Sequence, residues 1–260
     1  MNDNSLKDIL SSHFNGVAKK HQISSDLKNF GSKVNNEYLR SPYSYIESNF
    51  LNNLSEKRVL DYCCGTGIYS IIPALNGADV FGIDISQKSI DVAVKRATEL
   101  NLSEKCSFKT MDAENLEFKK DYFDLILIYG SLSYLNLNKS FKELSRVLKP
   151  DGKLIIIDSL GNNPLIKINR RKNIKRYAPN HFNEIMTPTF MDLDISLTYF
   201  DNLSIKYFDF FCLVGFFLSK NLKINLNPKL LKKLDSFFLK IPFINRMAFK
   251  FVCDLSFKKN

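Results

Sequence analysis

The chain has 260 residues, of which 45% are hydrophobic and 25% are charged, a balance that excludes an intrinsically disordered chain and predicts a folded core. Its five cysteines show no Cys-x-x-Cys spacing, which excludes a zinc knuckle or a disulfide framework and indicates a reduced, cytoplasmic setting. Nothing in residues 1–12 marks the chain for secretion, and the longest apolar run, residues 208–218, is too short to span a membrane as a helix.

The excess positive charge is confined to one part of the chain. The formal net charge is +10, yet residues 1–160 carry 20 basic and 20 acidic side chains, whereas residues 161–260 carry 17 basic and 7 acidic ones. This asymmetry indicates an anionic partner near the C-terminal part, such as an acidic substrate, a membrane surface or a nucleic acid. A solvated lysine-rich surface without a partner is the alternative.

Residues 1–50 predict a helical N-terminal cap, polar overall but with several aromatic side chains between residues 38 and 50. Over residues 58–160, short β-branched apolar runs alternate with segments of helical period, the pattern of βαβ units and a parallel sheet. The strands are expected at residues 58–62, 79–85, 106–110, 123–129 and 153–158. The helices between them are expected at residues 68–76, 87–101 and 138–148, the second of them capped by Ser86.

The segment after residue 160 predicts additions to this α/β core. In chain order we expect a basic segment at residues 163–177, a helix at 191–200, a strand region at 203–218, an amphipathic Lys/Leu/Phe helix at 228–239 and a closing strand at 248–255. There is no internal repeat and no low-complexity linker. We therefore predict a helical cap over residues 1–50 and one domain over residues 51–260, whose C-terminal elaboration occupies residues 161–260.

Two motifs point to a ligand. Residues 59–67 (VLDYCCGTG) form an apolar strand that runs into a glycine turn at the start of a helix, and glycine lets the backbone approach a ligand closely. In open α/β sheets, ligands bind beyond the carboxyl ends of the strands. Asp84 ends the next strand, where its carboxylate can accept both hydroxyls of a ribose. These features predict an adenosine-containing ligand, without separating S-adenosylmethionine from NAD.

In detail, residues 58–160 resemble the class I methyltransferases that use S-adenosylmethionine (SAM). The first motif of that family is D-x-G-x-G-x-G, and Asp61, Gly65 and Gly67 stand in register with it, with Cys63 in place of the first glycine. Three later motifs follow in the family's order, at residues 111–113 (MDA), at 123–130 (FDLILIYG) and at 148–157, which begins with LKPDG. The dinucleotide fingerprint G-x-G-x-x-G is incomplete, because Ser70 stands at the last glycine position when Gly65 and Gly67 take the first two, which disfavours a nicotinamide-dependent dehydrogenase.

The resemblance implies a Rossmann-like α/β fold with a seven-stranded, mostly parallel sheet whose last two strands form an antiparallel hairpin. Helices would cover both faces, with an N-terminal helical cap and a C-terminal helical insertion. It also implies SAM as the methyl donor, S-adenosylhomocysteine as the product and no metal. The cofactor-binding residues that it implies are Asp61, Cys63, Gly65, Gly67, Asp84, Ile85, Asp112, Ala113 and Tyr129. Among them, Asp84 would hold the ribose, and Ile85 would lie against the adenine.

The acceptor side is less well marked. Methyl transfer mainly requires that an acceptor lone pair is aligned with the methyl group, and a general base is needed only when the acceptor arrives protonated. Many relatives carry His-His just after the fourth strand, where this chain has Ser133-Tyr134. The candidate catalytic residues are Tyr134, His21 and His181, each with a structural role as the alternative. The missing base favours a thiol or amine acceptor and leaves hydroxyls open.

These observations support a SAM-dependent methyltransferase acting on a small-molecule acceptor. The basic, Leu/Phe-rich C-terminal part keeps open an anionic lipid or cell-envelope intermediate as acceptor, together with peripheral contact with an anionic membrane surface. No RNA-binding module is recognisable, which disfavours nucleic acid as a partner. The alternative from another class is a non-catalytic SAM-binding protein. The sequence does not indicate an oligomeric state.

Overall fold

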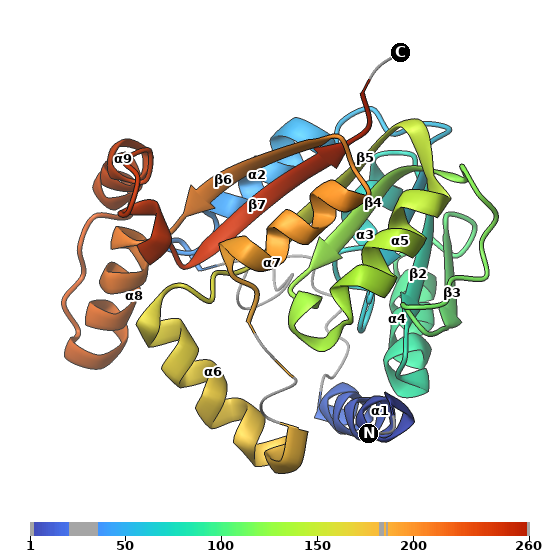
Figure 1. Ribbon diagram of the computed structural model, residues 1–260, viewed down its shortest axis with the longest axis horizontal. Helices are drawn as coiled ribbons and strands as arrows, with labels where there is room; N and C mark the ends of the chain where they lie inside the picture. Colours follow the sequence, from blue (N-terminus) through green and yellow to red (C-terminus); the bar gives the residue numbers. More distant parts are fainter. Residues whose placement is uncertain (1–2, 21–35, 182–184, 186, 259–260) are drawn as a thin grey trace.

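A computed structural model describes residues 3–20, 36–181, 185 and 187–258, and in these residues the chain forms a seven-stranded sheet covered by helices on both faces (Figure 1). The strand order is β3-β2-β1-β4-β5-β7-β6. The strands are β1 (Arg58–Tyr62), β2 (Asp79–Asp84), β3 (Cys106–Thr110), β4 (Phe123–Tyr129), β5 (Leu148–Ser159), β6 (Asn202–Phe208) and β7 (Lys250–Ser256). The predicted α/β class and the seven-stranded sheet are confirmed.

The pairing of the strands determines which strand ends lie side by side. β1 pairs in parallel with β2 and β4, β2 pairs in parallel with β3, and β4 with β5, whereas β7 runs antiparallel between β5 and β6. Both faces of the central strands are buried, as in the run 125–128 of β4, which is why these strands are continuously apolar. Because parallel strands end at the same edge, Tyr62, Asp84 and Tyr129 finish side by side. The expected antiparallel pairing of the last two strands is confirmed.

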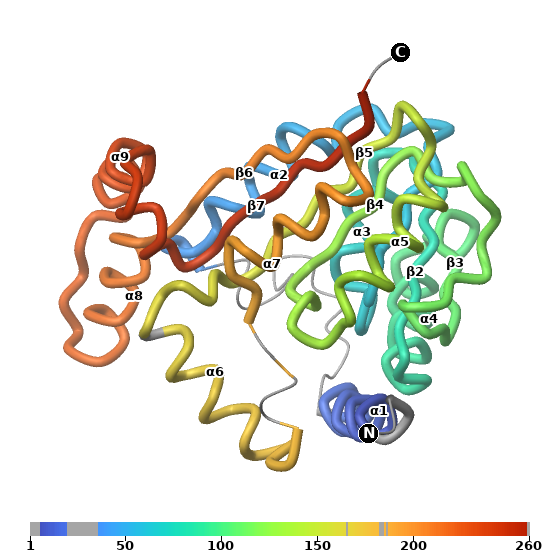
Figure 2. The backbone as a smooth tube through the Cα atoms, in the orientation of Figure 1, coloured from blue at the N-terminus to red at the C-terminus, as the bar shows by residue number. Residues whose placement is uncertain are grey.

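The longer helices surround this sheet, and α1 and α6 lie beyond its carboxyl edge (Figure 2). They are α1 (Asp3–Lys20), α2 (Ser41–Phe50), α4 (Gln87–Glu99), α5 (Leu137–Val147), α6 (Pro164–Tyr177), α8 (Phe211–Leu222) and α9 (Pro228–Phe238). Short helical segments are α3 (Ile71–Leu75), η2 (Leu132–Tyr134), η3 (Pro179–His181), α7 (Phe190–Asp194), η4 (Ile195–Thr198) and η5 (Asn245–Met247). Ser86 caps α4 as predicted, since its Oγ accepts from the Ser89 N–H at 3.1 Å.

The strand region expected at residues 203–218 is wrong in its second half. β6 ends at Phe208, and α8 occupies Phe211–Leu222. An apolar run alone does not distinguish a buried strand from a buried helix, and here a distant side chain starts the helix. The carboxylate of Asp235 in α9 accepts hydrogen bonds from the N–H groups of Phe210, Phe211 and Cys212, at 3.0, 2.7 and 3.1 Å. Tertiary capping therefore overrides the local pattern.

Two large apolar clusters pack on the two faces of the sheet. One contains Phe123, Phe141 and Phe251, and the other contains Ile46 and Leu127, all of them nearly inaccessible to solvent. A third, smaller cluster joins α1 to the C-terminal half of α6 and the residues beyond it; its fully buried members are Leu10, Ile174, Ala178 and Ile185. This third cluster holds α1 near the edge at which the parallel strands end. In the described part of the chain, no helix is long and apolar enough to cross a membrane.

Candidate functional site

The glycine turn after β1 has left-handed backbone at three positions. The φ angle is +60° at Cys63, +52° at Gly65 and +68° at Gly67. A Cβ added at Gly67 would lie 2.8 Å from the Cβ of Ala93, whereas nothing lies within 4 Å of the corresponding position at Gly65. The turn is therefore packed tightly on its inner side and leaves open space beside the backbone at Gly65, where a ligand can approach.

Asp84 links the end of β2 to this turn. Its Oδ2 accepts from the N–H of Gly65 and its Oδ1 from the N–H of Ser86, both at 2.9 Å. Burial raises the pKa of the Asp84 carboxyl, and these two hydrogen bonds oppose that shift. Each carboxylate oxygen has a second lone pair, so Asp84 can accept two further hydroxyl groups without losing its structural contacts.

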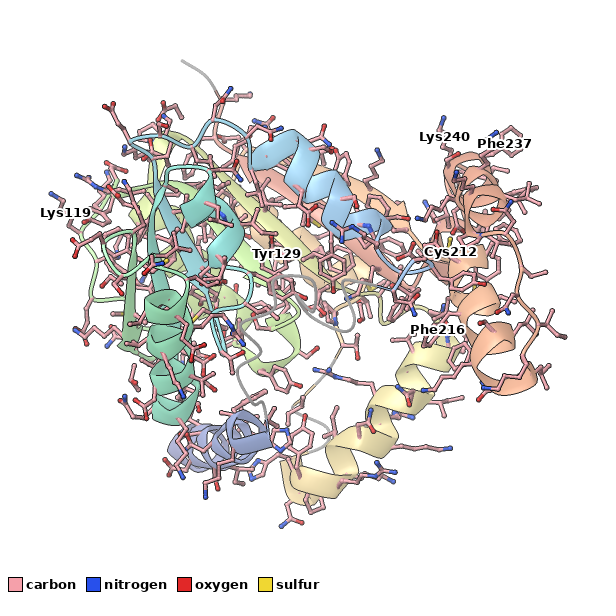
Figure 3. The ribbon with its side chains drawn as sticks, turned by 180° about the vertical axis from the view of Figure 1, so that it is seen from behind. Lys119, Tyr129, Cys212, Phe216, Phe237 and Lys240 are labelled. Carbon is pink, nitrogen blue, oxygen red and sulfur yellow. The ribbon has the colours of Figure 1, made fainter. Side chains whose placement is uncertain are left out.

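Asp61 lies beneath the turn and is almost fully buried, with 1% of its surface exposed. Its Oδ2 accepts from the Ser70 hydroxyl at 2.5 Å. Burial raises the pKa of Asp61 to about 7, the Ser70 hydrogen bond opposes the shift, and the charge of Asp84 adds to it. The ring of Tyr129, at the end of β4 (Figure 3), stacks on that of Tyr69 with centroids 4.0 Å apart. The cofactor-binding role expected of Asp61 and Tyr129 stays a prediction.

Helix α1 lies against the residues that follow β2. The Ser11 hydroxyl donates to the carbonyl oxygen of Ile85 at 3.3 Å. The Oδ1 of Asn15 accepts from the Ser86 hydroxyl at 2.8 Å and from the N–H of Lys88 at 3.2 Å. The N-terminal helix therefore covers the segment in which we predict the ribose and adenine contacts.

Lys7 ties the same helix to the residues after β3. Its Nζ lies 2.9 Å from Asp112 Oδ2 and 3.0 Å from Glu114 Oε2. Burial by itself lowers the pKa of Lys7, but the hydrogen bonds to Asp112 and Glu114 outweigh it and raise the pKa to about 12. The carbonyl of Ala113 accepts from the Tyr62 hydroxyl at 2.6 Å. The predicted cofactor-binding residues are thus held by two contacts, Asp112 by Lys7 of α1 and Ala113 by Tyr62 of β1.

The carboxyl end of β4 is followed by a glycine and two buried serines. Gly130 has a φ of +75° and open space where a Cβ would be. The hydroxyls of Ser131 and Ser133 are both buried; within the described part of the chain Ser133 makes no hydrogen bond, and Ser131 interacts with the thiol of Cys63. Each such group costs about 1–3 kcal/mol when buried unpaired. A hydroxyl like that of Ser133, unpaired among the described residues and close to an open turn, fits a site that is completed by a polar ligand such as SAM.

Tyr134, the predicted acceptor-side residue, lies in an aromatic group formed by α1, η2 and α6. The Phe14 ring meets the Tyr134 ring edge to face at 5.3 Å, and the Tyr177 hydroxyl lies 3.4 Å from that of Tyr134. The His13 ring stacks on the Tyr177 ring at 3.9 Å. The guanidinium of Arg170 lies 4.8 Å from the centre of the Tyr134 ring. These contacts bring residues of α1 and of α6, which are far apart in the sequence, to the end of β4.

Arg170 has unused hydrogen-bonding capacity in this group. Its Nε and Nη2 are buried and have no hydrogen-bond partner among the residues that the structure describes. Nearby, burial raises the pKa of the Asp158 carboxyl, and the positive charges of Lys250 and Arg170 oppose that shift. Buried N–H groups of a guanidinium are costly to leave without an acceptor, so an anion that binds to them is favoured.

The structure brings the predicted cofactor residues together at one sheet edge, with Tyr134 beside them. His21 lies outside the described residues, and His181 ends η3, in the segment after α6. The sequence does not mark Lys7, Arg170 and Tyr177 as site residues, because they are ordinary members of amphipathic or basic helices. Their proximity to the site depends on tertiary packing, and no local signal marks them.

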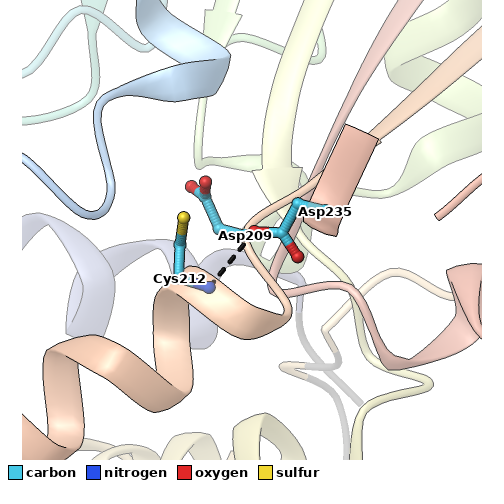
Figure 4. Close-up of side chains that lie close together, drawn as sticks. All are labelled: Asp209, Cys212 and Asp235. Atoms are coloured by element: carbon cyan, nitrogen blue, oxygen red, sulfur yellow. Dashed lines mark hydrogen bonds between the residues drawn. The ribbon is translucent and has the colours of Figure 1, made fainter. Parts of the chain in front are cut away.

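A second group of chemically active side chains lies at the base of α8. The possible ligand atoms of Asp209, Cys212 and Asp235 all lie within 4.8 Å of one another (Figure 4). Asp235, however, already caps α8 with both carboxylate oxygens. Burial, together with the charge of Asp235, raises the pKa of Asp209 to about 8. Protonation of Asp209 thus removes the repulsion between its carboxylate and that of Asp235. We assign the three residues a structural role in packing α8 against α9.

The chain is similar in sequence to a known family of domains. Residues 53–188, just over half of its length, match the family model described as a methyltransferase domain. The chain belongs to this methyltransferase domain family. Its resemblance to the class I methyltransferases is thereby confirmed, and the Rossmann-like sheet and the glycine turn are those of a methyltransferase domain.

Named relatives are similar over part of the chain. A demethylmenaquinone methyltransferase from Lactobacillus johnsonii is 36% identical over 126 residues, 46% of this chain and 51% of that protein. A sterol 4-C-methyltransferase from Caenorhabditis elegans is 32% identical over 136 residues, 52% of this chain and 40% of that protein. The match therefore spans about half of the length of these relatives or less. The crystal structure of geranyl diphosphate C-methyltransferase from Streptomyces coelicolor shares the fold, with a TM-score of 0.65 at 16% identity, over 96% of this chain and 97% of that one.

Proposed function

We propose that this methyltransferase domain protein transfers a methyl group from SAM to a small-molecule acceptor that carries an anionic group. When bound, SAM supplies an electrophilic methyl group, and S-adenosylhomocysteine remains after transfer. Asp84 would bind the ribose, because its carboxylate can accept further hydrogen bonds. The backbone at Gly65 would bind the methionine part, because the space beside it at the sheet edge is open. Asp112 and Ala113 would contact the adenine, with α1 as a cap held by Lys7.

The proposal of an anionic acceptor rests on one observation, the unused hydrogen-bond donors of the Arg170 guanidinium. It has buried, unpartnered Nε and Nη2 atoms among the described residues, and it lies on the ring of Tyr134. Arg binds phosphate and carboxylate groups with two parallel hydrogen bonds. We therefore place the anionic group of the acceptor at Arg170, with Tyr134 as a wall that positions the acceptor. The atom that accepts the methyl group can be carbon, nitrogen, oxygen or sulfur. The sequence favours a thiol or amine, and carbon is included because relatives are named as C-methyltransferases.

Calorimetry tests the cofactor part of the proposal. We expect SAM and S-adenosylhomocysteine to bind with micromolar dissociation constants and NAD to show no binding, because the chain lacks a complete dinucleotide fingerprint. Failure of SAM and S-adenosylhomocysteine to bind would refute the proposed donor. Binding of SAM without turnover of any acceptor would instead support a non-catalytic SAM-binding protein.

A panel of acceptors in matched pairs, with and without a phosphate or carboxylate, tests the acceptor part. The variant Arg170→Met should lower kcat/KM for the anionic members by about tenfold or more, since hydrogen bonds to a charged group are worth about 1.5–3 kcal/mol. The SAM dissociation constant should not change. Arg176→Met, an exposed arginine later in the same helix, is the matched control. Equal activity of Arg170→Met on anionic acceptors would remove Arg170 from the site.

A further inference from the structure

Helices α8 and α9 form a hairpin between β6 and β7 that exposes large apolar side chains. Of the fourteen large hydrophobic residues that are exposed in the described part of the chain, nine lie between residues 214 and 243. They are Val214, Phe217, Leu222, Ile224, Leu226, Leu230, Phe237, Ile241 and Phe243. Single exposed hydrophobic residues are ordinary, but such a concentration on one hairpin marks an interaction surface.

The same hairpin is strongly basic. Its exposed cations are Lys220, Lys223, Lys229, Lys233, Lys240 and Arg246. The one acidic residue between positions 210 and 248 is Asp235, which is buried and occupied in capping α8. Together, the exposed hydrophobic residues and these six cations form what we call the apolar-basic surface. It has no exposed carboxylate of its own to neutralise it.

Helix α9 shows how the two kinds of side chain are arranged. Leu231 and Asp235 are buried and face α8. On the opposite side, Leu230 and Phe237 stand seven residues apart and are 57% and 67% exposed, so that they share one strip of the helix. Lys229 and Lys233 run beside this strip at helical spacing, and Lys240 follows two residues after the helix ends. Figure 3 shows Phe237 and Lys240 pointing outward at the same end of the hairpin.

The hairpin is held firmly enough to present these side chains in a fixed arrangement. A Cβ added at Gly215 of α8 would lie 2.4 Å from Leu231 Cδ1, so the two helices approach closely at this point. Asp235 connects the helices through its hydrogen bonds to the first turn of α8. The Tyr38 hydroxyl donates to the carbonyl of Leu226 at 2.9 Å and anchors the loop between the helices. The exposed hydrophobic residues are therefore a built feature of the fold.

We propose that the apolar-basic surface docks the protein onto the headgroup region of an anionic lipid membrane. An apolar strip flanked by lysines, on a helix too short and too polar to span the bilayer, is the pattern of a helix that lies in the membrane interface. Exposed hydrophobic residues insert between the headgroups, while the surrounding cations bind lipid phosphates. The six cations and the absence of exposed acid favour an anionic lipid surface over a second copy of this equally basic hairpin. The inference does not depend on the proposed activity.

Sedimentation of the full chain with vesicles tests the proposal. We expect binding to phosphatidylcholine vesicles that contain about one third phosphatidylglycerol, weaker binding to phosphatidylcholine alone, and release as salt is raised, because salt screens the lysine–phosphate attraction. The double variant Phe237→Ser and Phe243→Ser should weaken binding by about tenfold, given the apolar area removed. The double variant Lys229→Glu and Lys233→Glu should abolish the preference for the anionic vesicles.

Two matched controls make the result specific. Met191→Ser removes a side chain that is 83% exposed on α7, and Lys119→Glu with Lys120→Glu reverses two exposed charges on the far side of the molecule, where Figure 3 labels Lys119. Both controls should bind vesicles like the unchanged chain. Equal loss in the controls, or no binding to anionic vesicles, would overturn the proposal. A concentration-dependent dimer that is broken by Phe237→Ser, without vesicle binding, would show that a second copy covers the surface instead.

Discussion

Lys7 of α1 donates to the carboxylate of Asp112, 2.9 Å away and 105 residues later in the sequence. This contact joins the N-terminal helix to the residues in which we place the adenine. We predict that Lys7→Met loosens α1 and raises the SAM dissociation constant by about fivefold, because a partly exposed ion pair contributes up to about 1 kcal/mol. Calorimetry measures the change. The control Lys95→Met, which removes a 3.9 Å surface ion pair with Glu99, should leave the SAM dissociation constant unaltered. If Lys7→Met also left this constant unaltered, the result would argue against a cap role for α1.

Asp84 offers the most direct test of the cofactor site. Replacing it with alanine removes the acceptor that we assign to the ribose hydroxyls, so SAM binding should weaken by about 1.5–3 kcal/mol, or roughly 10- to 150-fold. The lost hydrogen bond to Gly65 N–H would also loosen the glycine turn, and a thermal unfolding curve should be recorded beside the titration. Asp79→Ala, at the half-exposed start of the same strand, is the control. SAM affinity within twofold of the original in a folded Asp84→Ala protein would refute the assignment.

Cys63 occupies a position at which glycine would be less strained. Its φ is +60°, and a residue with a Cβ in this conformation costs about 1–2 kcal/mol relative to glycine. We therefore predict that Cys63→Gly raises the free energy of unfolding by about 1 kcal/mol, partly offset by the greater entropy of glycine in the unfolded chain. Urea denaturation measures this change. A clear loss of stability would show that the packing of the Cys63 side chain outweighs the backbone strain.

The fold of residues 58–160 could be predicted from the sequence because the signals there are local. The alternation of apolar strands with helices and the turns at Gly65 and Gly67 depend on neighbouring residues alone. The predicted first four parallel strands match the observed ones to within one residue at each end. The same holds for the placement of Asp84, since the end of a parallel strand fixes where its last side chain lies.

The rest of the site could not be predicted, because it depends on contacts between distant segments. Arg170 and Tyr177 reach Tyr134 only when α6 packs against α1. The helical start at Phe211 depends in the same way on Asp235, 24 residues later in the sequence. A basic helix and an apolar run carry no local record of such partners. These positions therefore became apparent only from the three-dimensional arrangement.

Asp209 should make the stability of the protein depend on pH. It is 1% exposed, and burial together with the charge of Asp235 raises its pKa from 3.8 to about 8, with the positive charge of Lys250 opposing the shift. The folded protein therefore holds a proton on Asp209 that the unfolded chain releases. Between about pH 4 and pH 8 the folded state binds more protons than the unfolded state, so this group lowers stability as pH rises, by at most about 1.4 kcal/mol per pH unit.

The variant Asp209→Asn separates this effect from the other carboxylates. Asparagine keeps the shape of protonated Asp209 and has no charge to bury, so at pH 8 its free energy of unfolding should exceed that of the unchanged chain, whereas near pH 4 the two should be similar. Urea denaturation at both pH values measures the difference. Asp151→Asn, at the exposed turn within β5, should show no such divergence. If Asp209→Asn were instead less stable at pH 8, the ionised carboxylate would have to be held by a cation, and the group with Cys212 and Asp235 would become a metal site to be tested by titration with Zn²⁺.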